Sequence, residues 1–297
     1  MNLVVGATGD LGGAVCKRLR EEGKPVRGLV RSTADAGKVD RLRQQGVDLA
    51  YGDLKDRRSL DAACAGVDTV ICTATTTVSR QPDDSIEDTD RDGCLSLVAA
   101  AKEAGVGRFV YLSYSGNIDR GSEPCRLTQA KRSVEAALQK SGMSYTIVRP
   151  SYFMEVWLSP IVGFDYGNAQ VAIYGSGESP ISWISREDVA KFVVQSLDNP
   201  IARNAILELG GPEPLSPLSV VSIFEESSGR SFAVTHVPVE ALREQIRTAD
   251  DSLQEAFAAL MLSHEDGDVI DMAKTLQAFS VPLSSVRDYA ESVSVRA

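Results

Sequence analysis

A glycine-rich segment near the start of the chain has the spacing of a loop that binds phosphate groups. Gly6, Gly9 and Gly12 follow the apolar run 3–5 and lead into a segment of helical period. The first glycine permits a tight turn, the second lets the backbone approach a pyrophosphate, and the third lets the helix pack closely on a sheet. The N–H groups at the start of that helix would stabilise the pyrophosphate. We therefore predict a dinucleotide site at Gly6, Thr8, Gly9, Asp10, Leu11 and Gly12, with the Asp10 side chain turned to solvent; a tight turn without a ligand is the alternative.

The residues after the second apolar run, 26–30, indicate which dinucleotide would bind. A carboxylate at this point would accept a hydrogen bond from the 2′-hydroxyl of NAD(H) and repel the 2′-phosphate of NADP(H). The chain has Arg31 and Ser32 instead. A guanidinium pairs well with a phosphate, and the serine hydroxyl can add a hydrogen bond. We predict NADP(H) rather than NAD(H), with an ordinary surface arginine as the alternative for Arg31.

Two later segments could complete the cofactor site. Asp53 could accept a hydrogen bond from the adenine amino group while Leu54 packs on the ring, and an N-cap role for Asp53 competes with this interpretation without excluding it. Thr73, Ala74 and Thr75 follow another apolar run. Small side chains would let the ribose and phosphates lie against the backbone there, although they also form loops readily.

All of these segments follow short apolar runs that alternate with segments of helical period. We predict strands at 3–5, 26–30, 47–51, 69–72, 109–112 and 145–148, and helices at 11–19, 59–64, 94–104 and 133–138. Glycines at 23, 46, 66, 105 and 142 lie where helices should end. The alternation predicts an α/β fold over residues 1–150, a doubly wound parallel-sheet Rossmann domain that binds NAD(P) at the carboxyl ends of its strands.

The pattern changes after Pro150. Residues 151–184 are rich in aromatic side chains and glycine and show no regular cycle, whereas 186–197 predict a helix and 205–209 a strand. The remaining residues indicate mostly helices separated by polar loops. We predict that residues 151–297 form a smaller C-terminal substrate cap whose segments partly interleave with the core sheet.

Composition excludes several classes of protein. The chain has 297 residues, with 31 Lys and Arg against 41 Asp and Glu, a net charge of −10. This charge argues against direct binding of nucleic acid. No apolar run is long enough for a membrane span, and the N-terminus lacks the features of a signal peptide, so we expect a cytoplasmic protein. Five cysteines without C-x-x-C spacing and only two histidines predict neither a disulfide framework nor a metal site.

The cysteines divide by their expected surroundings. Cys16, Cys64, Cys72 and Cys94 fall in predicted helices or strands and are expected to be small core residues. Cys125 follows the polar loop 121–124 and is the one thiol that we expect to be exposed.

Taken together, these segments resemble the atypical short-chain dehydrogenase/reductase superfamily, in its NmrA-like and isoflavone reductase-like branch. The resemblance covers nearly the whole chain and rests on residues 6–12, 29–31, 52–54, 109–113, 141–150, 153–155, 183–184 and 188–190. It implies that Ser113, Pro150, Tyr152 and Phe153 line the nicotinamide pocket. The register of Ser113 against Tyr114 is open, and hydrophobic packing competes with ring stacking for Tyr152 and Phe153.

The superfamily uses a Tyr as proton donor and a Lys four residues later, which holds the nicotinamide ribose. In this chain Leu127 occupies the Tyr position and Lys131 the Lys position. The resemblance implies a cofactor role for Lys131 and leaves proton transfer by this residue open. The alternative is that Lys131 and Arg132 form an exposed basic pair, balanced by Glu135 on the next turn.

Two functions follow from this resemblance. The first is an NADPH-dependent oxidoreductase that transfers hydride to a carbonyl, quinone or conjugated double bond of a small organic substrate. Without a Tyr acid, substrates whose reduced form needs little protonation are favoured, such as quinones, enones and cationic dyes.

The second is a non-catalytic NADP(H)-binding redox sensor of the NmrA type that acts through a protein partner. An epimerase or dehydratase of nucleotide sugars is less favoured because it normally needs the Tyr–Lys pair. The substrate and the oligomeric state are not encoded in any motif.

Overall fold

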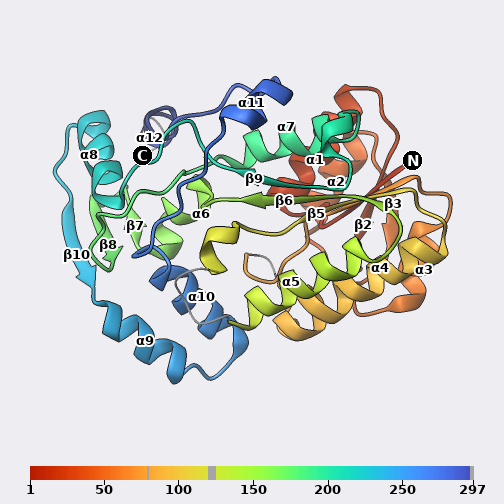
Figure 1. Ribbon diagram of the computed structural model, residues 1–297, viewed down its shortest axis with the longest axis horizontal. Helices are drawn as coiled ribbons and strands as arrows, with labels where there is room; N and C mark the ends of the chain where they lie inside the picture. Colours follow the sequence, from red (N-terminus) through yellow and green to blue (C-terminus); the bar gives the residue numbers. More distant parts are fainter. Residues whose placement is uncertain (79, 120–124, 295–297) are drawn as a thin grey trace. The chain divides into compact units, whose positions relative to one another are not determined.

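The computed structural model describes residues 1–78, 80–119 and 125–294 (Figure 1). The chain forms two compact units. Unit 1 comprises residues 1–113, 126–148 and 190–207, and unit 2 comprises the described parts of 114–125, 149–189 and 208–297. Each unit is therefore built from three separate stretches of chain. The functional division at Pro150 into a cofactor domain and a substrate cap stays a prediction.

A seven-stranded sheet forms the centre of unit 1, with β6 and β9 running a few residues into stretches assigned to unit 2. The strand order is β3-β2-β1-β4-β5-β6-β9, and β1 to β6 pair in parallel. The order reverses between β1 and β4, which is the switch point where doubly wound sheets bind their ligands. The predicted α/β class is confirmed. The strands are β1 Asn2–Val5, β2 Val26–Val30, β3 Asp48–Tyr51, β4 Thr69–Cys72, β5 Arg108–Leu112, β6 Ser144–Pro150 and β9 Ala205–Leu209.

Helices cover both faces of this sheet (Figure 1). One face carries α1 Asp10–Glu21, α2 Ala36–Gln44 and the part of α7 Arg186–Ser196 that belongs to unit 1; the other carries α3 Arg57–Cys64, α4 Cys94–Glu103 and α5 Arg126–Gln139. The five glycines predicted to end helices all have positive φ angles. Glycine adopts this conformation without steric cost. The strand interiors are buried on both faces, as the near-continuous apolar runs predict.

A π-helix, η1 Ile86–Gly93, precedes α4 and was not predicted from the sequence. Ser85 caps it, because its side chain accepts a hydrogen bond from the Asp88 backbone N–H. At its end Gly93 lies against Leu54, and a Cβ on Gly93 would come within 2.8 Å of the Leu54 Cβ. Helices of this type are rare and often occur at functional sites.

Unit 2 has a small sheet of its own, with the order β10-β8-β7. Strands β8 and β10 are parallel and β7 and β8 are antiparallel. The sequence analysis missed these strands because β7 has two residues and β10 is largely exposed. The elements are α6 Met154–Trp157, β7 Phe164–Asp165, β8 Gln170–Tyr174, α8 Pro217–Ser228, β10 Ala233–Val237, α9 Val239–Arg247, α10 Ser252–Leu262, α11 Ala273–Ala278 and α12 Val286–Ser294, with 3₁₀ turns η2 Gly116–Asp119 and η3 Pro160–Val162; a further turn, η4 Pro200–Ala202, belongs to unit 1.

One cysteine prediction is wrong. Cys125 is 4% exposed, so it is not the accessible thiol that its polar neighbours suggested; the loop 121–124 itself lies outside the described residues. The other four cysteines are buried and free, as expected. Within the described ranges, no helix combines the length and the apolar character needed to cross a membrane.

Candidate functional site

The glycine loop forms a tight turn that is possible only because glycine has no Cβ atom. Gly6 has a φ angle of 87° and its carbonyl accepts a hydrogen bond from the Gly9 N–H at 2.9 Å. Gly9 is the N-cap of α1. A Cβ on Gly12 would lie 2.1 Å from the Gly6 carbonyl oxygen, so the first turn of α1 can approach the turn only with glycine there. The N-terminus of α1 therefore lies directly above the turn, as a pyrophosphate site requires.

The segment after β4 lies against the same turn. The Thr73 hydroxyl donates to the Val5 carbonyl at 3.1 Å, and a Cβ on Gly6 would come within 2.9 Å of the Ala74 backbone nitrogen. Thr75 lies two residues further on, and its hydroxyl contacts the Thr77 hydroxyl at 3.2 Å. The structure thus brings together two segments that the sequence analysis assigned to one ligand. Of the remaining loop residues, Thr8 is half-buried, Leu11 is buried and Asp10 is exposed, as expected for Asp10.

Arg31 follows β2, and a carboxylate that the sequence analysis did not identify binds it. Its Nη1 donates to Oδ2 of Asp84 at 2.5 Å, while Lys55 Nζ donates to Oδ1 of the same carboxylate at 2.8 Å. The Asp84 side chain is 2% exposed and that of Arg31 is 28% exposed. Ser32, the next residue along the chain, is exposed. Arg31 is therefore an anchored cation rather than a free surface arginine.

Asp53 does not cap a helix, contrary to one of its two predicted roles. The N-cap of α3 is Asp56, whose side chain accepts from the Arg58 N–H. Asp53 instead accepts from the Lys55 N–H at 2.8 Å, which closes a local turn after β3. Leu54 is buried in the core of unit 1. The contact of Asp53 and Leu54 with adenine stays a prediction.

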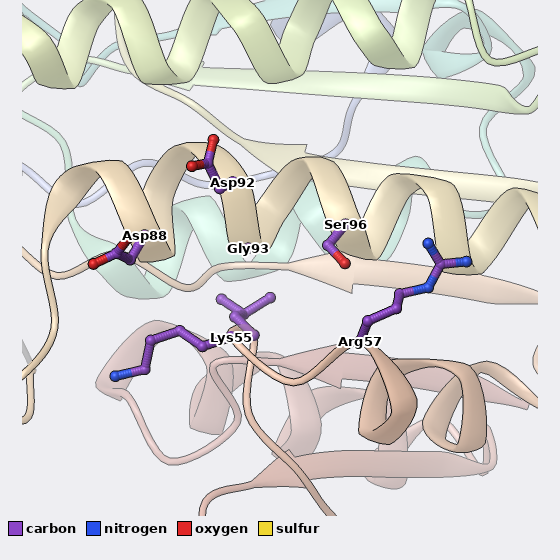
Figure 2. A pocket seen from close by; sticks show the side chains of 7 residues that line it. Lys55, Arg57, Asp88, Asp92, Gly93 and Ser96 are labelled. Carbon is purple, nitrogen blue, oxygen red and sulfur yellow. The ribbon is translucent and has the colours of Figure 1, made fainter.

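A depression of about 260 Å³ lies between the turn after β3 and the η1–α4 helix (Figure 2). Leu54, Lys55 and Gly93 are among its lining residues. In Figure 2 the Lys55 side chain extends along the rim in the opposite direction from Arg57. Apart from Leu54, none of the predicted cofactor residues lines it. The remaining lining residues are Arg57, Asp88, Asp92 and Ser96.

Lys131 lies in the interior of unit 1, which rules out the exposed basic pair. Its side chain is 5% exposed, and Nζ lies 3.2 Å from Oδ1 of the fully buried Asp90. The other carboxylate oxygen of Asp90 accepts hydrogen bonds from the Thr76 backbone N–H at 3.0 Å and from its hydroxyl at 2.7 Å. Nζ also lies 5.4 Å from the centre of the Tyr111 ring, within the range of a cation–π contact. Glu135 pairs with Arg132, not with Lys131.

The surroundings of Lys131 keep its ammonium charged. Burial by itself would lower the pKa of Lys131, but the Asp90 carboxylate and the nearby sulfur atoms of Cys94 and Cys72 outweigh it, so the pKa is raised above its usual value. An ammonium has three N–H donors, yet Asp90 is its one acidic partner within the described chain. In the same part of the structure, Asp90 Oδ1 has the Lys131 ammonium as its partner, and the buried Tyr111 hydroxyl has no hydrogen-bond partner among the described residues. Unpartnered buried polar groups of this kind call for a ligand or water.

Ser113 directly follows β5 and is buried. Its Oγ accepts a hydrogen bond from Arg132 Nη1 at 2.9 Å, and its N–H donates to the Val148 carbonyl. Because Arg132 neighbours Lys131 on α5, this bond ties the end of β5 to the helix that carries the buried lysine. The Ser113 hydroxyl and Lys131 thus lie in parts of unit 1 that a side-chain hydrogen bond joins.

The remaining predicted site residues belong to unit 2. Pro150 ends β6, and Phe153 is the N-cap of α6. Tyr152 is 3% exposed; its hydroxyl bonds to the Ser263 hydroxyl, and its ring lies 4.5 Å from that of His264. The Tyr152 ring and hydroxyl both have partners within unit 2, consistent with the packing role left open above.

A buried carboxylate in unit 2 was also missed by the sequence analysis. Asp268 is 1% exposed, and its Oδ1 accepts from the Ser115 hydroxyl and from Asn117 Nδ2, both at 2.7 Å. Among the residues that the structure describes, its Oδ2 has no hydrogen-bond partner. No motif could have revealed this group, because its partners lie about 150 residues away in the sequence.

Comparison with known proteins assigns the family. The model of the NmrA-like family matches residues 2–290. This chain belongs to the NmrA-like family. It is 30% identical over 265 residues to NAD(P)H azoreductase from Xenophilus azovorans, a match that covers 87% of this chain and 86% of that protein. It is 28% identical over 303 residues to photosystem II assembly factor Ycf39 from Trieres chinensis, covering 97% and 90% respectively.

Solved structures of this NmrA-like fold confirm the architecture. NADPH-dependent quinone oxidoreductase QOR2 from Escherichia coli, complexed with NADPH, matches with a TM-score of 0.79 at 21% identity, over 99% of both chains. At that identity the likeness concerns the fold. The family predicted from the motifs is confirmed, and its relatives include a protein named as an NAD(P)H azoreductase.

Proposed function

We propose that this NmrA-like protein is an NADP(H)-dependent reductase of small organic molecules. The observation that carries the proposal is the buried Lys131–Asp90 pair, located in the same unit as the glycine loop and the anchored Arg31. A charged lysine inside a protein with unused N–H donors is costly unless it serves a ligand. The naming of a 30% identical relative as an NAD(P)H azoreductase supports the same conclusion.

The residues present fit the cofactor. The turn at Gly6, Gly9 and Gly12 leaves room only for backbone, and the N-terminus of α1 would hold the pyrophosphate. Arg31 would bind the 2′-phosphate. Bound NADPH would supply the hydride, so the protein has to position the substrate and exclude water. The other proposed cofactor residues are Thr8, Asp10, Leu11, Ser32, Asp53, Leu54, Thr73, Ala74, Thr75, Ser113, Pro150, Tyr152 and Phe153.

Lys131 is the proposed residue at the reacting end of the cofactor. Asp90 keeps the ammonium protonated, and Thr76 fixes the carboxylate through two hydrogen bonds. The ammonium can then donate to the hydroxyl groups of the nicotinamide ribose. Because its pKa is raised, Lys131 gives up a proton less readily than an ordinary lysine, which favours a binding role over proton transfer.

The proposed substrates follow from the absence of a general-acid tyrosine at position 127. Leu127, at the position of the superfamily tyrosine, is 2% exposed and has no proton to give. Quinones and enones give stabilised anions on hydride addition, and cationic dyes give neutral products. Such acceptors need little help from a general acid.

The test is NADPH oxidation by the purified protein with a panel of quinones, enones, aldehydes and cationic dyes. Lys131→Met is expected to lower kcat/KM by about 10- to 100-fold, the effect of losing a hydrogen bond from a charged group. Lys140→Met, which changes the exposed residue directly after the end of the same helix, is the matched control and should leave kcat/KM unchanged. Equal activity of the two variants would remove Lys131 from the reaction.

A non-catalytic sensor is the second candidate, and Leu127 in place of the tyrosine favours it. The 28% identical relative named as a photosystem II assembly factor supports a role through protein partners. A sensor would bind NADPH and pass hydride to no acceptor in the panel. In that case the cofactor would act by changing the affinity for a protein partner.

A further inference from the structure

Three charged side chains meet beside the strand ends where the 2′-phosphate would bind. Asp84 accepts from Arg31 Nη1 at 2.5 Å, from Lys55 Nζ at 2.8 Å and from the Gln81 backbone N–H at 2.7 Å. Both of its oxygens are therefore engaged, and the side chain is 2% exposed. This carboxylate is a fixed part of unit 1, because the bond to the Gln81 N–H closes a local turn around it.

The two cations belong to neighbouring strand ends. Val30 of β2 lies opposite Tyr51 of β3 in the parallel register, so the turns that carry Arg31 and Lys55 leave the sheet at the same edge. Both side chains converge on Asp84 although Lys55 was not predicted to take part in the site. A guanidinium offers five N–H donors, and one of its nitrogens is bound by Asp84. The remaining donors can still pair with a phosphate.

The carboxylate of Asp84 offsets part of the positive charge at this point. Arg31 and Lys55 contribute two positive charges, and Asp84 removes one of them. Exposed Asp83 binds Lys55 alone, at 2.8 Å. Asp84 weakens the positive field of these two cations, so it weakens their attraction for a phosphate monoester on the ribose. A neutral 2′-hydroxyl interacts much less with this field.

We propose that Asp84 is a specificity-determining residue of the dinucleotide site. Its carboxylate occupies donors of Arg31 and Lys55 that would otherwise bind the 2′-phosphate. It thereby reduces the ratio of the affinity for NADP(H) to the affinity for NAD(H). Lys55 is the second cation of this subsite. The inference rests on the proposed dinucleotide site but not on hydride transfer, since it concerns the adenosine end of the cofactor alone.

The experiment uses cofactor fragments that lack the nicotinamide. Adenosine 2′,5′-bisphosphate and adenosine 5′-monophosphate are titrated calorimetrically into the full-length protein, and the ratio of their Kd values measures the preference for the 2′-phosphate. Asp84→Asn keeps the size of the side chain and is expected to increase this preference by about tenfold at low salt, with a smaller gain at high salt. Asp83→Asn changes the net charge equally but removes an exposed group, and should alter the ratio by less than about twofold.

Lys55→Gln removes the second proposed cation of this subsite. It should weaken binding of the bisphosphate and leave the Kd of the monophosphate unchanged. This result tests the subsite even if Asp84→Asn does not fold. An unchanged or reduced preference in Asp84→Asn would overturn the inference, as would equal effects of the Asp83 and Asp84 variants. Failure of the unsubstituted protein to bind either fragment would refute the dinucleotide site as well. A protein that shows the expected shift but reduces no acceptor would contradict only the reductase proposal.

Discussion

At the scale of single residues, the pairing of Lys131 with Asp90 is the feature that links the interior of unit 1 to function. The two groups come from α5 and η1, and Thr76, from the loop after β4, holds the carboxylate in place. Removing one partner of such a buried pair leaves the other charge uncompensated. The Asp90 carboxylate therefore both compensates the buried ammonium and sets the charge state of the lysine.

Asp90→Asn tests both contributions. Without the carboxylate, burial is no longer opposed and the pKa of Lys131 falls. The protonated lysine is lost as pH rises through its pKa, so the alkaline limb of the kcat/KM profile should move to lower pH. The free energy of unfolding should decrease by about 3 kcal/mol.

Asp92→Asn is the matched control, because Asp92 is exposed and pairs with the adjacent Arg91. Its pH profile and urea midpoint should match those of the unsubstituted protein. A normal alkaline limb in Asp90→Asn would show that Asp90 does not set the charge of Lys131.

At the scale of elements, the contact of α1 with the end of β1 decides whether the phosphate turn can form. A Cβ on Gly12 would lie 2.1 Å from the Gly6 carbonyl oxygen and 2.8 Å from the Thr73 hydroxyl. Both neighbours are held by backbone or by hydrogen bonds and cannot easily move away. The helix would have to shift along its axis and would no longer point its N–H groups at the turn.

Gly12→Ala is therefore expected to reduce NADPH affinity by about 100-fold or more, since it removes the pyrophosphate contacts of the helix N-terminus. Gly13→Ala is a closely matched control: a Cβ there would meet the Ala7 carbonyl oxygen at 3.5 Å, an ordinary contact. Binding is measured by fluorescence titration of NADPH. Similar affinities for the two variants would contradict the role assigned to α1.

The sequence predicted most of the elements of unit 1 because its strands are buried on both sides, which gives continuous apolar runs. The bounds of β2 and β4 are as predicted, and those of β1, β3, β5 and β6 differ from the prediction by one or two residues at an end. It did not predict η1, since Ile86–Gly93 is mostly polar and shows no apolar run or helical period. It missed β10 because an exposed strand does not need apolar residues.

At the scale of the whole molecule, the stability of unit 2 depends on a neutral histidine in its core. His264 is buried among Tyr152, Trp157 and Trp183, with ring centres 4.5 to 5.9 Å away. Burial lowers its pKa to about 4. In the unfolded chain the imidazole binds a proton near pH 6.5. Between these values the unfolded chain holds more protons, so stability falls as the pH falls.

Lowering the pH from 7 to 5 should therefore cost about 2 kcal/mol of unfolding free energy through this histidine alone. His264→Gln removes the titration and should flatten this part of the stability curve. His236→Gln, which changes the exposed histidine, should leave it unchanged. Urea unfolding can be followed by tryptophan fluorescence, because both tryptophans of the chain lie in unit 2. A curve for His264→Gln as steep as that of His236→Gln would contradict this account.

The sequence by itself determined the fold class, the glycine turn and the family. These depend on local properties: apolar runs that need burial, glycines that need space or positive φ, and motifs in a fixed order. It also selected Arg31 and Lys131, although it offered an exposed alternative for each. Periodicity on a helix could not exclude that alternative, because Glu135 stands one turn from Lys131 whether or not the lysine is buried.

Only the tertiary structure decided what these side chains contact. Asp84 reaches Arg31 from 53 residues away, and Asp90 and Thr76 enclose Lys131 from separate loops and helices. Such pairings depend on where strand ends meet at one edge of a sheet. The sequence around a distant carboxylate does not indicate which residue it will pair with. The charge state of Lys131 and the field at the proposed 2′-phosphate subsite are therefore properties of the folded chain, since both depend on distances that folding alone creates.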